Sequence, residues 1–297
     1  MRRLLRGAYV ESAIWTEADA RERHILRLRA IDGTRAAPPV FSHVSAAALH
    51  GLPVLGAWPA IGHVSSDTPG RSRNGVAYHQ ALPGRIPDFI GGLACTSLVD
   101  TLVDLALSTG FRSATISIDH ALHGVALTAN AGQFGVSLAS PEATQAATEF
   151  KAQLMDTLHR SAPARNFRRA EKALLFASHL SESPGESLSR CGIHLLGFPA
   201  PELQHEFYDY LGFIGRGDFW WPGIRLLGEF DGEDKYKNPA YLGNRTPHQA
   251  LIDEKRREDR IRQTKVDVSR WDWKTALELP GLYAKLFAAG LRPTGQR

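Results

Sequence analysis

Residues 217–232 read GDFWWPGIRLLGEFDG, a Pro-Gly pair between two runs in which acidic and apolar side chains alternate. Pro222 and Gly223 suit the two central positions of a type II turn, because proline presets φ and glycine accepts a positive φ. The stretch therefore predicts a β-hairpin with strands over residues 217–221 and 224–231. A two-residue loop would place Asp218 opposite Leu227.

The predicted hairpin separates acidic from apolar side chains. Side chains alternate along a strand, and opposed residues share a face. One face then carries Asp218, Glu229 and Asp231 beside Leu227. The other face is a ready core surface made by Phe219, Trp221, Ile224, Leu226 and Phe230.

The acidic face could hold a divalent cation. In this register Asp218 and Glu229 are diagonal neighbours about 7–8 Å apart, a gap that two carboxylate side chains can close on one hard metal ion. Three like charges on one face also repel each other, and a cation or nearby lysines and arginines would relieve that repulsion. The plainer alternative is a solvated polar face on an edge hairpin, and spacing alone leaves both interpretations open.

Composition places the chain among soluble globular proteins. Its 297 residues predict about two domains of roughly 150 residues each, and 43% hydrophobic with 22% charged residues is ordinary for that class. No apolar run approaches the roughly 18–20 residues that span a membrane, and the start of the chain lacks the apolar segment of a signal peptide. We therefore expect a cytoplasmic protein without a membrane partner.

The cysteines and histidines match no metal-ligand spacing. Cys95 and Cys191 form no CxxC motif and no disulfide framework, so we interpret them as buried thiols. Four histidines alternate with turn signals and are interpreted as structural: His43, His50, His63 and His79.

The net charge of +4 lies entirely in the second half of the chain. Residues 1–150 hold 12 Lys and Arg against 12 Asp and Glu, and residues 151–297 hold 23 against 19. A basic half that also carries the acidic hairpin is compatible with binding and cutting a polyanion such as DNA.

The first half reads as a mixed α+β domain. Periodic apolar residues and caps such as Ser42 and Ser97 predict its helices. The expected elements are a basic strand over 1–10, helices over 17–31 and 42–50, short strands between 54 and 95, and helices over 98–106, 111–123, 141–160 and 164–180. Arginines on the helices over 17–31 and 164–180 fit a solvated face or a nucleic-acid contact.

The second half has the order helix, three strands, helix, strand, helix. A helix opens at Ser183, a strand covers 203–207, and the hairpin follows; then come a highly charged helix over 247–263, a strand over 266–271 and a closing helix over 282–289. One mixed sheet covered by helices is the simplest packing, so the fold class is α/β (α+β). We expect the boundary between Ser161 and Ser183 and divide the chain into residues 1–165 and 166–297.

Glu186 has two interpretations. It lies in the first turn of the helix that Ser183 opens, where the helix dipole favours a carboxylate. It could equally add a further acidic group to the hairpin site.

Residues 183–275 resemble the Vsr-like branch of the PD-(D/E)XK nuclease superfamily. The resemblance lies in Asp218 and the run from Glu229 to Gly232, in the preceding helix with Glu186, and in the residues that follow: Glu254, Lys255, Arg256, Arg257, Glu258, Asp259 and the strand ending at Arg270 and Trp271. It implies a restriction-endonuclease-like mixed sheet flanked by helices. It also implies a DNA endonuclease that uses Mg²⁺ or Mn²⁺.

The roles that this resemblance implies transfer residue by residue. Asp218 matches the metal-binding Asp and Glu229 the Glu of the signature, with Asp231 as a further metal ligand. Asp231 stands where the usual lysine would be, and Glu186 matches an acidic residue that some members supply from the preceding helix. Candidates to replace the lysine are Lys235 and Lys255, and candidates for phosphate contacts are Arg256, Arg257 and Arg260.

The first half is similar to AbiEi-type proteins, the antitoxin and regulator side of type IV toxin–antitoxin systems. The similarity lies in GAYV at residues 7–10, SHVSAA at 42–47, HGLP at 50–53 and TSLVDTLVDLA at 96–106. Such proteins begin with a DNA-binding winged helix, and here Met1 falls about where the last strand of that wing would be. The implied alternative function is a non-catalytic DNA-binding regulator or antitoxin with a cognate toxin protein as partner.

Overall fold

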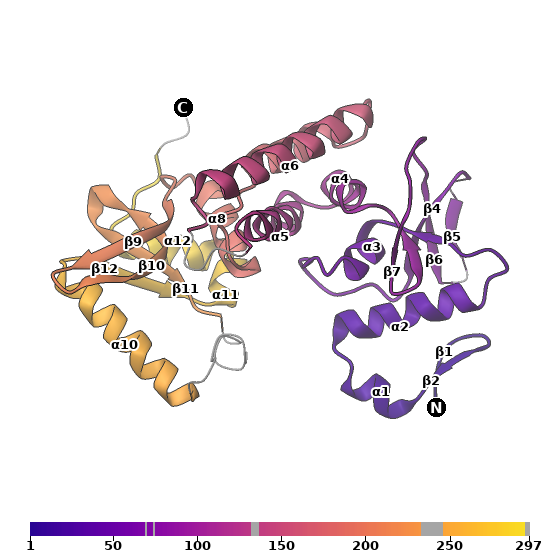
Figure 1. The fold of residues 1–297 in the computed structure, drawn as a ribbon, viewed down its shortest axis with the longest axis horizontal. Helices are drawn as coiled ribbons and strands as arrows, with labels where there is room; N and C mark the ends of the chain where they lie inside the picture. Colours follow the sequence, from indigo (N-terminus) through magenta and orange to yellow (C-terminus); the bar gives the residue numbers. More distant parts are fainter. Residues whose placement is uncertain (69, 74, 132–136, 233–245, 295–297) are drawn as a thin grey trace. The chain divides into compact units, whose positions relative to one another are not determined.

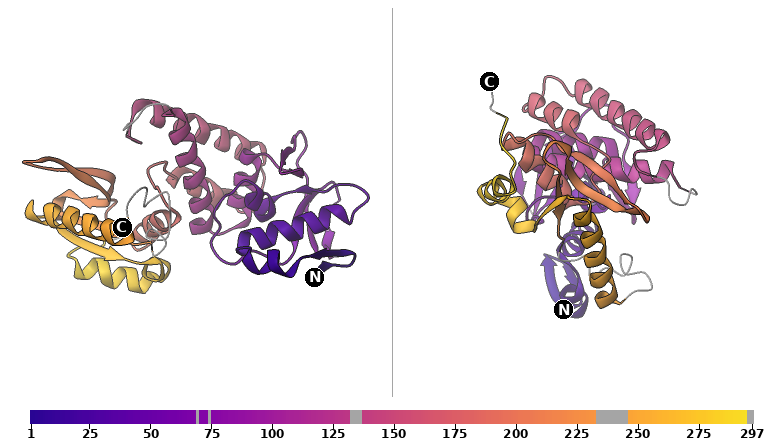
Figure 2. Two further views of the ribbon diagram at one scale, coloured as in Figure 1. Left: turned by 60° about the horizontal axis from the view of Figure 1, so that its bottom comes forward. Right: turned by 90° about the vertical axis from the view of Figure 1, so that its left-hand side faces the viewer.

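The computed structural model describes residues 1–68, 70–73, 75–131, 137–232 and 246–294, and it divides the chain into two compact units. The first unit is Met1–His179 and the second is Leu180–Arg297. Both combine helices with mixed sheets, as predicted, and their elements follow one another along the colour scale of Figures 1 and 2.

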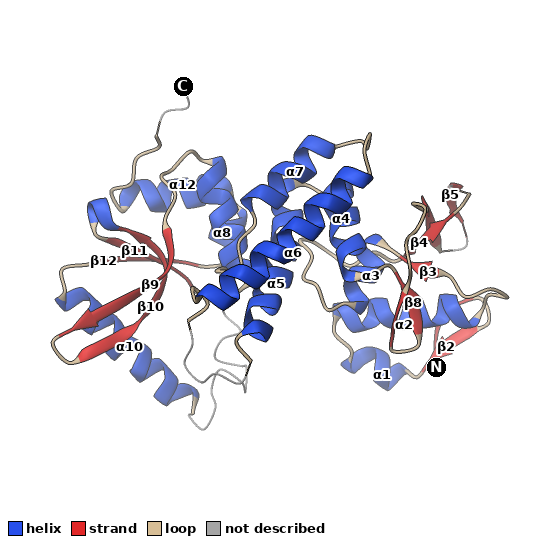
Figure 3. Cartoon of the chain, turned by 45° about the horizontal axis from the view of Figure 1, so that its top comes forward, coloured by secondary structure: helices blue, strands red, loops and turns tan. Residues whose placement is uncertain are grey.

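The first unit begins with a small hairpin and a mixed sheet. Strands β1 (Arg2–Leu5) and β2 (Ala8–Val10) pair with each other, and helices α1 (Ser12–Glu17) and α2 (Ala20–Gly33) follow. A six-stranded sheet of order β5-β6-β4-β3-β8-β7 comes next, and its strands β3, β4, β5 and β8 are labelled in Figure 3. Its elements are β3 (Val40–Phe41), α3 (His43–Leu49), β4 (Gly62–Ser66), β5 (Gly70–Arg73), β6 (Val76–Gln80), β7 (Asp88–Ile90) and β8 (Leu93–Cys95).

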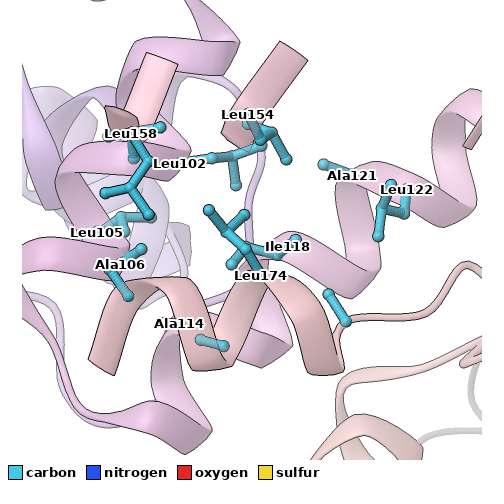
Figure 4. Packing of buried hydrophobic residues seen from close by; sticks show 14 of the residues in the cluster. Leu102, Leu105, Ala106, Ala114, Ile118, Ala121, Leu122, Leu154, Leu158 and Leu174 are labelled. Atoms are coloured by element: carbon cyan, nitrogen blue, oxygen red, sulfur yellow. The ribbon is translucent and has the colours of Figure 1, made fainter. Parts of the chain in front are cut away.

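Four helices complete the first unit: α4 (Leu98–Ser108), α5 (Phe111–Ala129), α6 (Pro141–Arg160) and α7 (Phe167–Phe176). Their buried faces share one core, in which Leu102, Ile118, Leu154 and Leu174 are fully buried (Figure 4). Because Leu174 lies on α7, that helix belongs to the first unit. The structure divides the chain after His179, within the expected interval but later than residue 165.

The second unit has the predicted elements in the predicted order, with the 3₁₀ turn η1 and the short helix α11 in addition. Its elements are α8 (Pro184–Leu195), β9 (Glu202–Asp209), β10 (Gly212–Trp221), the 3₁₀ turn η1 (Pro222–Ile224), β11 (Leu226–Phe230), α10 (Pro247–Gln263), β12 (Asp267–Trp271), α11 (Trp273–Leu277) and α12 (Leu279–Ala288). The sheet order is β12-β11-β10-β9, and only β11 and β12 are parallel (Figure 3).

Helices cover both faces of this sheet. Ile261 of α10 packs with Trp220 and Leu227 on one face. On the other face Trp271 donates from Nε1 to Ser189 Oγ of α8 at 2.8 Å. The predicted hairpin therefore forms the two central strands of a covered sheet, and the alternative of a solvated edge hairpin is wrong.

The hairpin turn is longer than predicted. Pro222 opens a 3₁₀ turn, Ile224 is 44% exposed in it, and Arg225 adopts a left-handed conformation with φ 51°. Trp221 pairs with Leu226, so the same register brings Asp218 opposite Glu229 rather than opposite Leu227. The shift is two residues, and because side chains alternate with a period of two, the predicted division into faces survives for the strand residues.

Candidate functional site

Glu229 lies at the centre of a charged network. Its side chain is 6% exposed on β11, directly beside Arg270 on the parallel strand β12. Glu229 Oε1 is 2.5 Å from Arg257 Nη2, and Oε2 is 2.6 Å from Arg270 Nη2. Both carboxylate oxygens therefore bind a guanidinium.

Glu254 joins the same two arginines from helix α10. It accepts from Arg257 at 2.8 and 3.0 Å and from Arg270 Nη2 at 2.8 Å. Burial alone would raise the pKa of Glu254, but these hydrogen bonds and charges outweigh it and lower the pKa to about 2. Burial likewise disfavours the charged arginines, yet Glu254 and Glu229 raise the pKa of both above its ordinary value. Glu254, Arg257 and Arg270 are therefore charged at neutral pH.

Asp218 and Glu186 form a second acidic pair. Asp218 Oδ2 accepts the backbone N–H of Phe230 at 2.8 Å. Glu186 is 6% exposed, and burial followed by the charge of Asp218 raises its pKa well above the ordinary value. The two carboxyl groups therefore repel each other.

Glu186 also caps its helix, which confirms the first of its two interpretations, the carboxylate in the first turn of a helix. Its Oε1 accepts from Ser183 Oγ at 2.7 Å, and its Oε2 accepts from the backbone of Glu182 at 2.9 Å and from Gln204 Nε2 at 3.2 Å. Ser183 in turn accepts from the Glu186 backbone N–H at 3.2 Å, which completes the cap of α8.

The remaining predicted acidic and lysine residues are Asp231, Lys255 and Lys235. Asp231 is 45% exposed and binds Arg270 Nη1 at 3.3 Å. Lys255 is exposed on α10, and no carboxylate of the described residues pairs with it. Lys235 lies outside the described residues. Among the described residues the cations that reach Glu229 are thus the guanidiniums of Arg257 and Arg270.

The predicted phosphate contacts differ in their surroundings. Arg256 is exposed on α10. Arg260 makes two hydrogen bonds to Asp209 at 2.7 and 2.8 Å, and Arg257 is committed to Glu229, Glu254 and the carbonyl of Arg216. Arg256 is accordingly the member of this set that is open to a ligand.

The chemistry of the acidic pair suits a hard cation. No three acidic, histidine or cysteine side chains in the described part of the chain are arranged to hold a metal ion. Magnesium in proteins usually takes only one or two carboxylates and completes its shell with water and substrate phosphates. Of the predicted metal ligands, Glu229 could join such a shell only after an arginine leaves it.

Three of the four histidines singled out in the first unit gather on its sheet. His63 Nδ1 and His79 Nε2 are 2.8 Å apart, and the ring of His43 stacks on His79 with centroids 3.7 Å apart. Burial, followed by the nearby His79, lowers the pKa of His43 to about 2 and that of His63 to about 4. These rings are stacked, hydrogen-bonded and neutral, so they serve packing.

Arginines surround Trp15 in the first unit. The guanidinium carbons of Arg2, Arg27 and Arg23 lie 4.5, 4.8 and 5.7 Å from the centre of its ring. Burial, then the charges of Arg2 and Arg23, lowers the pKa of Arg27. Within the described ranges no carboxylate forms an ion pair with these three, while Arg23 donates to the carbonyls of Trp15 at 2.9 Å and Thr16 at 3.1 Å.

This chain is similar to two proteins of Mycobacterium tuberculosis. They are "Uncharacterized protein MT2308" of strain CDC 1551 / Oshkosh and "Uncharacterized protein Rv2248" of strain ATCC 25618 / H37Rv. Each is 28% identical over 168 residues, which is 57% of this chain and 54% of the relative. The chain thus spans about half the length of these curated relatives. No family model matches the chain, and no solved structure matches it.

Within the described residues, every helix is too short or too polar to traverse a lipid bilayer.

Proposed function

We propose that the second unit hydrolyses DNA phosphodiester bonds with Mg²⁺ or Mn²⁺, as a nuclease-like domain of the PD-(D/E)XK type. The observation that carries this proposal is the bond from the backbone N–H of Phe230, the residue after Glu229 on β11, to Asp218 Oδ2 on the adjacent central strand β10, with Glu186 near enough to Asp218 for the pKa of Glu186 to rise. The order of helices and strands around them supports it, because it is the order that the resemblance implies. A DNA substrate implies action in the cytoplasm.

Each side chain has a role in this proposal. Asp218 and Glu186 would hold the cation, and Glu229 would join them once an arginine moves. A bound cation supplies polarisation of the phosphate and a lowered pKa for the attacking water. Arg257 and Arg270 hold the buried Glu229 in place, since each places a guanidinium on one of its oxygens.

Nicking of supercoiled plasmid tests the proposal. We expect conversion to open circles with Mg²⁺ or Mn²⁺, none with EDTA, and a loss of at least about 100-fold for Asp218→Asn and Glu229→Gln, as for removal of a group that stabilises the transition state. Glu202→Gln is the matched control, because Glu202 is a 55% exposed acidic residue of the same sheet. Equal nicking by all four proteins would refute a hydrolytic role.

A second candidate function is a DNA-binding regulator or antitoxin, and the arginines around Trp15 favour it. Three guanidiniums without an acidic partner suit phosphate contacts, which position a protein on DNA without reading bases. This function predicts binding of duplex DNA, or of a cognate toxin, that persists in Glu229→Gln. Fluorescence anisotropy with Arg27→Gln beside Glu229→Gln separates the two: loss of DNA binding only in Arg27→Gln supports the regulator.

A further inference from the structure

Gln204 holds a backbone conformation that its residue type rarely adopts. Its φ is 54°, in the left-handed region, where the Cβ atom of an L-residue crowds the following carbonyl oxygen. Gln204 lies inside β9, whereas the other described non-glycine residues with positive φ lie at turns or helix ends: His43, Asn166, Arg225 and Lys265. Such strain persists only where the surrounding structure holds the residue in place, and it gathers at functional sites.

The register of the sheet places Gln204 beside the predicted acidic residues. The residues on either side of Gln204 pair with the residues on either side of Asp218, so these two lie opposite each other on β9 and β10. The side chain of Gln204 donates from Nε2 to Glu186 Oε2 on α8 at 3.2 Å. Gln204 therefore lies between two carboxyl groups that come from different elements.

The bond from Gln204 ties the carboxylate of Glu186 to the sheet. Glu186 is 6% exposed, and its other hydrogen-bond donors among the described residues are Ser183 Oγ at 2.7 Å and the backbone N–H of Glu182 at 2.9 Å. Both of those donors lie at the start of α8, so they fix the carboxylate only relative to its own helix. Gln204 fixes it relative to the strand beside Asp218.

We propose that Gln204 is a positioning residue, whose amide holds the carboxylate of Glu186 beside Asp218 for phosphodiester hydrolysis. The inference rests on the proposed function of the second unit. The strained backbone and the amide donor are separate features of Gln204. Glycine would remove both, and methionine would remove the donor alone.

The kinetics of plasmid nicking by Gln204→Met test this role. Methionine has a similar length and no N–H donor, so kcat should fall about 10- to 100-fold with KM unchanged, as when a residue that orients a site group is lost. Gln263→Met is the matched control, because Gln263 is exposed at the end of α10. A wild-type kcat in Gln204→Met, or a change in KM alone, overturns the proposal.

A double substitution tests whether Gln204 acts through Glu186. In Glu186→Gln the carboxylate is already gone, so adding Gln204→Met should lower kcat no further. A further fall by the same factor shows that Gln204 acts independently of Glu186, and it overturns the assignment.

Thermal melts separate positioning from a merely structural role. Gln204→Gly and Gln204→Met both lack the amide, but glycine accepts a positive φ without strain. Gln204→Gly should therefore melt about 2–6 °C higher than Gln204→Met and yet nick as slowly. Nicking that recovers together with the melting temperature overturns the positioning role.

A further variant keeps the test decisive if Gln204→Met fails to fold. Asparagine tolerates the left-handed region, and its amide is one methylene shorter than that of glutamine. Gln204→Asn should therefore fold and nick slowly. Nicking at the wild-type rate in Gln204→Asn overturns the proposal.

Nuclear magnetic resonance of the side-chain amides, without added metal, tests the contact apart from catalysis. The signals of Gln204 are those lost in Gln204→Met, and they should shift in Glu186→Gln while the signals of Gln263 stay in place. Unmoved Gln204 signals overturn the contact. A wild type that nicks no plasmid but shows this shift overturns the nuclease function and supports the contact. Nicking that depends on Asp218 and Glu186 but not on Gln204 overturns the inference alone.

Discussion

Glycines around the charged site show how closely its elements pack. A Cβ atom at Gly185 would collide with the ring of Phe230, and one at Gly228 would lie 2.5 Å from Cη2 of Trp271. Both rings sit in the apolar layer between the sheet and α8, where Phe230 and Trp271 are nearly fully buried. Glycine at these positions lets α8, and with it Glu186, approach the sheet.

Gly185→Ala should therefore destabilise the second unit by about 1–3 kcal/mol, as expected for overpacking in a close-packed interior. The matched change is Gly124→Ala in α5, where nothing lies within 4 Å of the added carbon. Alanine there should stabilise the first unit by about 0.5–1 kcal/mol, because alanine loses less backbone conformational entropy than glycine when the chain folds into the helix. Urea denaturation measures the free energy of unfolding of both variants. Equal changes of the same sign would contradict the packing argument.

At the scale of single side chains, sequence could place the acidic residues on one face but not their partners. The period of two along β10 and β11 put Asp218 and Glu229 together even though the turn is longer than predicted. Arg270 could not be found this way. It reaches Glu229 through the parallel pairing of β11 and β12, whose register is set by the long connection through α10.

Helix α10 joins the apolar packing of the sheet to the charged network. Ile261 is fully buried against Trp220 and Leu227, while Arg257, one turn earlier on the same helix, reaches Glu229. The position of the guanidinium thus depends on the packing of the isoleucine. A substitution that removes the buried side chain of Ile261 should therefore also disturb the ion pair between Arg257 and Glu229.

Ile261→Ala should cost about 2–5 kcal/mol, because it leaves a cavity between α10 and the sheet. Ile252→Ala on the same helix removes a side chain that is 38% exposed and should change stability by less than about 0.5 kcal/mol. Urea denaturation followed by tryptophan fluorescence measures the difference. Comparable destabilisation by both variants would show that α10 is not held through Ile261.

The order of the helices and strands was easier to predict than the compact unit to which each of them belongs. The order of helices and strands after Ser183 follows from periodicity and caps, both of which are local. Helix α7 was assigned to the wrong side of the boundary at residue 165, because its apolar face of Ala170, Ala173 and Leu174 carries no sign of which core it joins. That choice depends on α4, α5 and α6, and it is visible only once they pack together.

The whole chain contains two units with separate cores, and falling pH weakens the buried histidines of the first unit at higher pH than the ion pairs of Glu254 in the second. In the first unit, buried histidines are held neutral, and burial lowers the pKa of His24 to about 4. In the second, arginines hold Glu254 ionised, because their hydrogen bonds and charges lower its pKa to about 2. Compact units with their own cores are expected to unfold as separate cooperative transitions.

His24 shows in which direction acid changes the stability of the first unit. Its ring is fully buried, bonded to Pro59 O at 2.9 Å and to Ser45 Oγ at 3.1 Å. Because the pKa is about 4 when folded and 6.5 when unfolded, the unfolded chain binds the extra proton between these values. Stability from His24 is present above pH 6.5 and is lost as pH falls to 4. Asp104 acts the other way, because burial raises its pKa to about 6.

Calorimetry at pH 7 and pH 4.5 should therefore show two transitions, of which the one belonging to the first unit moves down in acid. His24 alone contributes about 3 kcal/mol over its full window, at 1.36 kcal/mol per pKa unit, and His43 and His63 add to it in the same direction. His24→Gln should destabilise the first unit at pH 7 and narrow its shift between the two pH values, while the second transition stays in place. His205→Gln is the control, because His205 is partly exposed on β9 of the second unit. If acid lowers the second transition as much as the first, buried neutral histidines are not what makes the chain sensitive to acid.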